Sequence, residues 1–125
     1  MRFMMIMIPA PMDEADWSPS PEAVSAMSKY NNELRDAGML LSLDGLHPAS
    51  KGARVSFAGG KAKATDGPFA EAKEVIGGYW LIDAKSKQDA VEWAARCPGA
   101  DGDTIEVRQV YEMSEHSPEV QEAAR

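Results

Sequence analysis

Cysteine and histidine are scarce in this chain of 125 residues, which contains one cysteine and two histidines. The single cysteine, Cys97, excludes an internal disulfide and a cysteine-rich metal site, and this fits a reducing cytoplasm. Because Cys97 ends a predicted helix, we expect a small buried apolar side chain rather than a reactive thiol. The histidines, His47 and His116, lie far apart and have no ligand spacing, so no metal site is expected.

Motifs and charges that bind nucleotides or nucleic acids are also missing. No GxGxxG follows a strand and no P-loop is present, so we expect no nucleotide cofactor. The net charge is −7 and no basic patch is visible, whereas a phosphate-binding surface needs clustered lysine and arginine. The apolar run over residues 3–8 is too short to cross a bilayer and has no cleavage site, so we interpret it as a strand rather than a membrane segment.

The composition that remains is that of one globular domain. Hydrophobic residues make up 44% of the chain, which is enough for a core, and the length is too short for two domains. We place the domain at residues 1–113. The polar tail at residues 114–125 is expected to be loosely held or helical.

Periodicity predicts an α+β fold. Strand patterns cover residues 2–8, 39–43, 75–82 and 103–113, and Gly77-Gly78 indicates either a bulge or a close approach in the third of these. Helices are predicted over residues 21–37 and 87–97, and a hairpin over residues 53–58 and 61–65. Without the hairpin the order is βαββαβ, a ferredoxin-like sandwich with both helices on one face of the sheet.

The other face of this predicted sheet has a consequence for assembly. Apolar side chains of Phe3, Met5, Trp80, Ile82 and Val107, or of their neighbours, are expected on a surface that two helices cannot cover. An open apolar sheet of this size is unusual in a monomer, so we expect a homodimer in which a second copy covers it. A pocket between the two sheets would follow.

Several motifs together resemble the DGPF-type branch of the YCII-related proteins. They are Asp66-Gly67-Pro68-Phe69, then Glu71, Lys73, Glu74 and Gly77-Gly78-Tyr79-Trp80, with Gly45-Leu46-His47-Pro48 and Arg96-Cys97-Pro98 elsewhere. The resemblance covers residues 1–113 and implies a dimeric α/β barrel of the ferredoxin-like type. It implies little about activity, because members are largely uncharacterised.

The resemblance also implies a partner and a possible site. Some members are encoded beside sigma factors of the extracytoplasmic type, which implies a regulatory link. Shorter members carry a histidine on the first helix that has been suggested to pair with an aspartate. In this chain Met27 lies near that position, so the catalytic proposal does not transfer directly.

His47 and Asp66 are the candidate catalytic residues. His47 is the only histidine in the predicted domain, and imidazole suits proton transfer near neutral pH. It is either a general base or ligand-orienting donor in a pocket, or a loop histidine bonded to backbone. Asp66 either orients His47 or binds a cation, or it only forms the turn before Gly67-Pro68.

Five residues are candidates for ligand contact: Arg54, Phe69, Glu71, Lys73 and Trp80. The planar fork of Arg54 matches a carboxylate, although it equally suits a pair with Asp66 or Glu71. Glu71 and Lys73 either belong to a solvated charge cluster or point inward. Trp17, in a polar loop, either pins that loop to the body or lines the mouth of a pocket.

Two functional hypotheses follow from these residues. The chain is either a dimeric module that binds a small ligand or a regulatory partner, or a cofactor-independent enzyme that acts on a small, partly apolar molecule with His47 as proton shuttle. The first is favoured, because the helix histidine is missing and no nucleophile lies beside a base.

Overall fold

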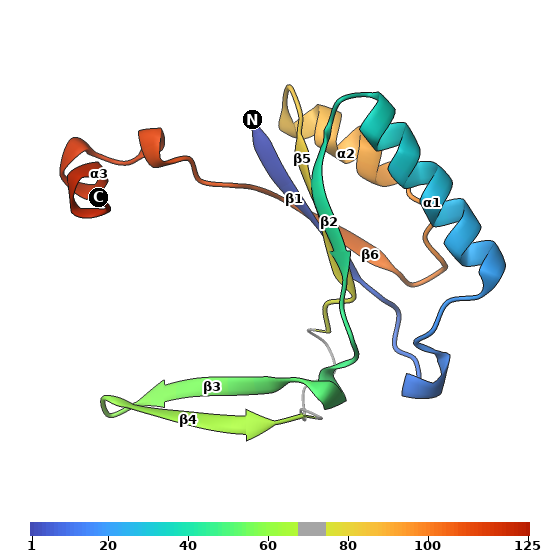
Figure 1. Ribbon diagram of the computed structural model, residues 1–125, viewed down its shortest axis with the longest axis horizontal. Coiled ribbons are helices and arrows are strands. Elements are labelled where there is room, and N and C mark those ends of the chain that lie inside the picture. Colours follow the sequence, from blue (N-terminus) through green and yellow to red (C-terminus); the bar gives the residue numbers. More distant parts are fainter. Residues whose placement is uncertain (68–74) are drawn as a thin grey trace.

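The computed structural model of the protein describes residues 1–67 and 75–125. In chain order the elements are β1 (Arg2–Ile8), η1 (Glu14–Asp16), α1 (Pro21–Asp36), β2 (Leu40–Gly45), η2 (Ala49–Lys51), β3 (Ala53–Ala58), β4 (Lys61–Asp66), β5 (Gly78–Asp83), α2 (Lys87–Ala95), β6 (Thr104–Gln109), η4 (Met113–Glu115) and α3 (Pro118–Ala123). The main sheet has four antiparallel strands in the order β2-β5-β1-β6. Helices α1 and α2 lie on one side of it (Figure 1). The predicted ferredoxin-like α+β fold is confirmed.

Both main helices begin where the sequence places a capping serine. The Oγ atom of Ser20 accepts an N–H of the first turn of α1 at 3.1 Å, and Ser86 accepts the N–H of Asp89 at 3.1 Å. The Asp89 carboxylate in turn accepts the N–H of Lys85 at 3.2 Å. In a capping box the residue at the Asp89 position is usually glutamate or glutamine. Here Asp89 takes that place, and its carboxylate satisfies a backbone donor beside the start of α2.

The core fills the space between the helices and the sheet. Its buried side chains are Phe3, Met5, Tyr30, Leu34, Met39, Trp80, Ile82, Ala84 and Ala90. In the register, Phe3 pairs with Ile82, and Met5 pairs with Trp80 and Val107. Alternate residues of these strands therefore share the helix-covered face. Of the two alternatives left open for the uncovered face, the named residues Phe3, Met5, Trp80, Ile82 and Val107 are therefore excluded and their neighbours remain, because alternation fixes the period but not the phase.

Their neighbours occupy the uncovered side, which we call the open face. In the middle strands it carries Met4, Ile6, Ile8, Tyr79 and Leu81, all partly exposed. The edge strands add polar groups, and the Tyr79 hydroxyl donates to the Asp44 carboxylate at 2.8 Å. The open face is thus apolar in the middle and polar at the edge.

Two strand boundaries differ from the prediction. The predicted end of the second strand at residue 43, before Asp44-Gly45, is wrong, since β2 continues through Gly45, which pairs with Gly78. A Cβ atom on Gly78 would lie 2.7 Å from the carbonyl oxygen of Asp44. Glycine at position 78 therefore lets the two backbones approach closely, and the expected third strand begins only there.

The last strand is shorter than the pattern indicates, and the tail after it is helical, which is one of the two alternatives expected. Strand β6 ends at Gln109, so Tyr111, which the alternation places in the last strand, lies beyond it and is 74% exposed. The tail contains η4 and α3. No helix among the residues that the structure describes is long and apolar enough to span a lipid bilayer.

The predicted hairpin is confirmed as a separate two-stranded sheet of β3 and β4. Its turn residues Gly59 and Gly60 have φ angles of 56° and 73°, as the tightest right-twisting hairpin turns require. Every residue of both strands is exposed. In Figure 1 the hairpin extends from the sheet on the side away from the two helices.

Candidate functional site

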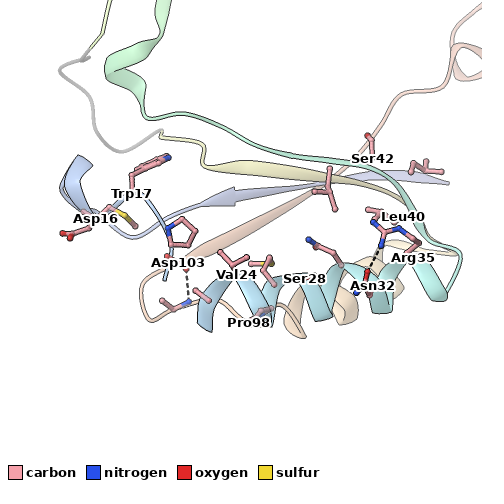
Figure 2. Close-up of a pocket in the computed structure, with 18 residues that line it drawn as sticks. Asp16, Trp17, Val24, Ser28, Asn32, Arg35, Leu40, Ser42, Pro98 and Asp103 are labelled. Atoms are coloured by element: carbon pink, nitrogen blue, oxygen red, sulfur yellow. Dashed lines mark hydrogen bonds between the residues drawn. The ribbon is translucent and has the colours of Figure 1, made fainter. Parts of the chain in front are cut away.

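A groove of about 1070 Å³ lies between α1, β2 and the loop that contains η1 (Figure 2). Its apolar lining includes Trp17, Val24, Met27, Leu40 and Leu43. Small-molecule sites in proteins usually have volumes of about 300–1000 Å³ and mostly apolar walls with a few polar groups. The groove has the size and the lining of such a site.

Trp17 closes one end of the groove. Its indole N–H donates to the carbonyl oxygen of Leu46 at 3.0 Å, which ties the η1 loop to the chain beyond β2. The same side chain lines the groove. Both alternatives for Trp17 are therefore confirmed, because the bond that pins the loop also holds the ring at the groove.

Amide and guanidinium groups from α1 form the other end. The indole N–H of Trp80 donates to the Asn31 side-chain oxygen at 2.8 Å, and a guanidinium N–H of Arg35 donates to the Asn32 oxygen at 2.6 Å. Because indole and guanidinium are donors only, both asparagine oxygens are engaged, and the amide N–H groups remain as donors. This end is therefore rich in donors and carries the Arg35 cation.

The two ends of the groove differ in electrostatic character. Figure 2 shows Arg35 and Asn32 toward one end of α1 and Trp17 and Asp16 toward the other. Asp103 also lines the groove, but its carboxylate accepts the backbone N–H groups of Ala10 at 2.8 Å and Ala100 at 2.9 Å. The Asp103 carboxylate therefore has a structural role, and Arg35 marks the end suited to an anion.

The two candidate catalytic residues do not meet in the described structure. His47 is exposed between β2 and η2, and Asp66 is exposed at the end of β4, opposite Ala53. Across residues 1–67 and 75–125, no hydrogen bond or ion pair joins them. The role of His47 as a proton shuttle stays a prediction.

The ligand-contact candidates fall in three different places. Arg54 lies on the exposed hairpin. Trp80 is only 6% exposed and stacks edge to face on Tyr30, with ring centroids 6.0 Å apart; it reaches the groove through its bond to Asn31. Phe69, Glu71 and Lys73 lie outside the described residues.

Sequence reasoning missed the polar residues of the groove. Asn31 and Arg35 follow the buried residues Tyr30 and Leu34 by one position each, so they flank the apolar stripe of α1. This spacing in the sequence indicates where the two side chains lie, because polar residues beside a buried stripe are found at the edge of the core. The groove that these residues line could not be read from the sequence, since contacts between segments far apart in the chain create it.

Burial controls the titration of the core groups near α2. The pKa of the Tyr30 hydroxyl is raised by desolvation, and the hydroxyl donates to the Trp93 carbonyl at 2.7 Å. Burial, with a smaller effect of Asp103, raises the pKa of the Cys97 thiol to about 11. At neutral pH the thiol is therefore protonated, which supports the expectation of an unreactive side chain. Within the described residues, no three His, Cys, Asp or Glu side chains group as metal ligands.

Comparison with known proteins gives a family and a relative. A profile of the YCII-related domain matches residues 1–114. An uncharacterised protein of Rhizobium meliloti (strain 1021) is 32% identical over 78 residues, which cover 62% of this chain and 63% of the relative. The chain thus matches less than two thirds of that relative's length. The assignment to the DGPF-type branch stays a prediction.

Proposed function

The chain belongs to the YCII-related family, and from that premise we propose that it is a homodimeric module that binds a small, partly apolar molecule. The groove between α1 and β2 is the observation that carries the proposal. The similar R. meliloti protein is itself uncharacterised, so the ligand class is argued from the lining of the groove. The regulatory link to a sigma factor stays a prediction.

The lining supports an amphipathic ligand. Val24, Met27 and Leu43 supply apolar contact along the groove, and burial of apolar surface is the main source of affinity for such a body. At the donor-rich end, the guanidinium of Arg35 matches a carboxylate through charge-assisted hydrogen bonds. We therefore propose a small monocarboxylate with an apolar tail as the ligand class.

The dimensions of the groove agree with this class. Val24 and Arg35 both line it and lie eleven positions apart on α1, which corresponds to about 16 Å along the helix axis. An acid with a medium-length alkyl chain can place its carboxylate at Arg35 and its tail toward Trp17. A small polar acid would leave most of the apolar lining of the groove exposed to solvent.

The open face supports the homodimer. Met4, Ile6, Ile8, Tyr79 and Leu81 form its apolar middle on β1 and β5, and contiguous apolar surface on a sheet usually marks an interface. Two copies related by a two-fold axis would bring the same patch together. The dimeric α/β barrel expected from the resemblance has this arrangement.

Isothermal titration calorimetry with octanoate and 1-octanol tests the ligand site. We expect wild-type protein to bind octanoate at least about tenfold more tightly than 1-octanol, because a charge-assisted hydrogen bond is worth about 1.5–3 kcal/mol. The Arg35→Gln variant should lose this preference. Arg125→Gln, which removes an exposed cation from the C-terminal end, is the matched control and should keep it.

Two results would overturn the ligand proposal. One is the absence of octanoate binding to the wild-type protein. The other is an unchanged preference for the acid in Arg35→Gln, which would place the anion elsewhere on the molecule.

A further inference from the structure

The β3–β4 hairpin is amphipathic. Its register pairs Val55 with Ala64 and Phe57 with Ala62, so these four side chains share one face, which we call the arm face. The opposite face of the hairpin is polar and carries Arg54, Ser56, Lys61, Lys63 and Thr65. This division is the one expected of a strand pair with one buried side.

Within the described chain, the arm face is uncovered. Phe57 is 80% exposed and Val55 is 55% exposed, and no other described element packs extensively on either strand. A two-stranded hairpin alone is only marginally stable in water, and burial of phenylalanine and valine side chains is favourable. Contact of the arm face with another surface would therefore bury these apolar side chains and stabilise the hairpin.

The net charge of the hairpin favours a second copy of this chain as its partner. Because the cations lie on the polar face, they act through long-range attraction rather than at the arm face itself. The hairpin, residues 53–66, carries one arginine, two lysines and one aspartate, a net charge of +2, while the whole chain carries −7. The remaining residues thus carry −9. A basic arm on an acidic body is attracted to the body of another copy, and this attraction helps to orient the encounter.

The direction of the hairpin agrees with the proposed dimer. In Figure 1 helices α1 and α2 lie on one side of the main sheet, and the hairpin and α3 extend on the other side. A second copy seated on the open face would therefore lie beside the hairpin. Two-fold symmetry would give each copy one arm and one surface that receives the arm.

We infer that the β3–β4 hairpin is a docking arm, and that its arm face packs against a second copy of this chain. The inference rests on the proposed homodimer and deepens it. It assigns the dimer two contact regions, the open face and the arm. His47, Arg54 and Asp66 lie at or near the base of the arm, so docking would also bring them close to the partner.

Sedimentation equilibrium of the full chain over a concentration series in low-salt buffer tests the arm. We expect the double variant Val55→Ser/Phe57→Ser to raise the dimer dissociation constant at least tenfold, because it removes the apolar contact. Lys61→Glu/Lys63→Glu should also weaken the dimer, and less so at high salt because ions screen the attraction. The matched control Ser56→Ala/Thr65→Ala changes the polar face without changing charge and should stay within twofold of wild type.

The outcomes separate the arm from the dimer. A dimeric wild type with an unchanged dissociation constant in Val55→Ser/Phe57→Ser overturns the arm and leaves the homodimer standing. A wild type that sediments as a monomer at every concentration overturns both. Circular dichroism of each variant checks that the sheet and helices are folded, and if the serine variant fails this check, the lysine variant decides by the same criterion.

Discussion

The helix-covered face of the main sheet and the arm face of the hairpin follow the same alternation but have opposite environments. Phe3 on the covered face is 1% exposed, whereas Phe57 on the arm face is 80% exposed. The covered face packs on α1 and α2, and the arm face has no such cover in the described chain. Alternation therefore predicts an apolar face, but it does not say whether the same chain covers that face.

The largest expected difference between the two regions comes from one substitution made in each. Phe3→Ala should lower the free energy of unfolding by about 3–5 kcal/mol, because it leaves a cavity in the core. Phe57→Ala should lower it by about 0.5 kcal/mol or less when the protein is dilute. Urea denaturation of both variants measures the difference. Equal losses would show that the hairpin packs within its own chain.

A second comparison uses one hydrogen bond from each side of the main sheet. Asn31→Ala removes the acceptor of the Trp80 indole, and an unpaired donor near the core should cost about 1–3 kcal/mol. Asp44→Ala removes the acceptor of the Tyr79 hydroxyl on the open face, which water can replace when the protein is dilute enough to be monomeric, so the cost there should be about 0.5 kcal/mol or less. Thermal or urea unfolding measures both, and the reverse order would contradict the burial assigned here.

Alkaline pH should weaken the covered region through Cys97. The folded state raises the pKa of this thiol from 9.0 to about 11, so folding favours the protonated form. Its contribution to stability is complete below pH 9 and is lost as the pH rises toward 11. The loss of unfolding free energy between pH 8 and pH 10 should therefore be smaller in Cys97→Ala than in wild type. An identical loss in both proteins would contradict the burial of the thiol.

The smallest effect is expected at His47, which is exposed and does not line the groove. His47→Ala should change the free energy of unfolding by no more than about 0.5 kcal/mol and should leave octanoate affinity unchanged. Calorimetry with octanoate measures this. A large loss of affinity would move the ligand site from the groove to the base of the arm and would revive the catalytic hypothesis.

Much of the fold could be predicted because its signals are local. Ser20 and Ser86 start the helices, Gly59-Gly60 turns the hairpin, and the order of the elements predicts the ferredoxin-like sheet. These features depend on neighbouring residues in the chain. The phase of β1 and β5 could not be predicted, because near-continuous apolar runs place apolar side chains on both faces.

The groove could not be predicted because four segments form it, namely the η1 loop, α1, β2 and the loop after α2. Trp17 was recognised as a residue at a pocket mouth or a pin, but its bond to Leu46 brings the η1 loop to β2 only in the folded chain. Arg35 carries no motif that separates it from other helical cations. The ligand-binding role proposed for Arg35 depends on what the fold places opposite the end of its helix.

Hydrogen exchange as a function of protein concentration tests the central claim most directly, namely that the hairpin needs a second copy while the main sheet does not. We expect amides of β1 and β5 to be protected at every concentration, and amides of β3 and β4 to gain protection only as dimer forms. Protection of the hairpin that is independent of concentration would contradict the claim.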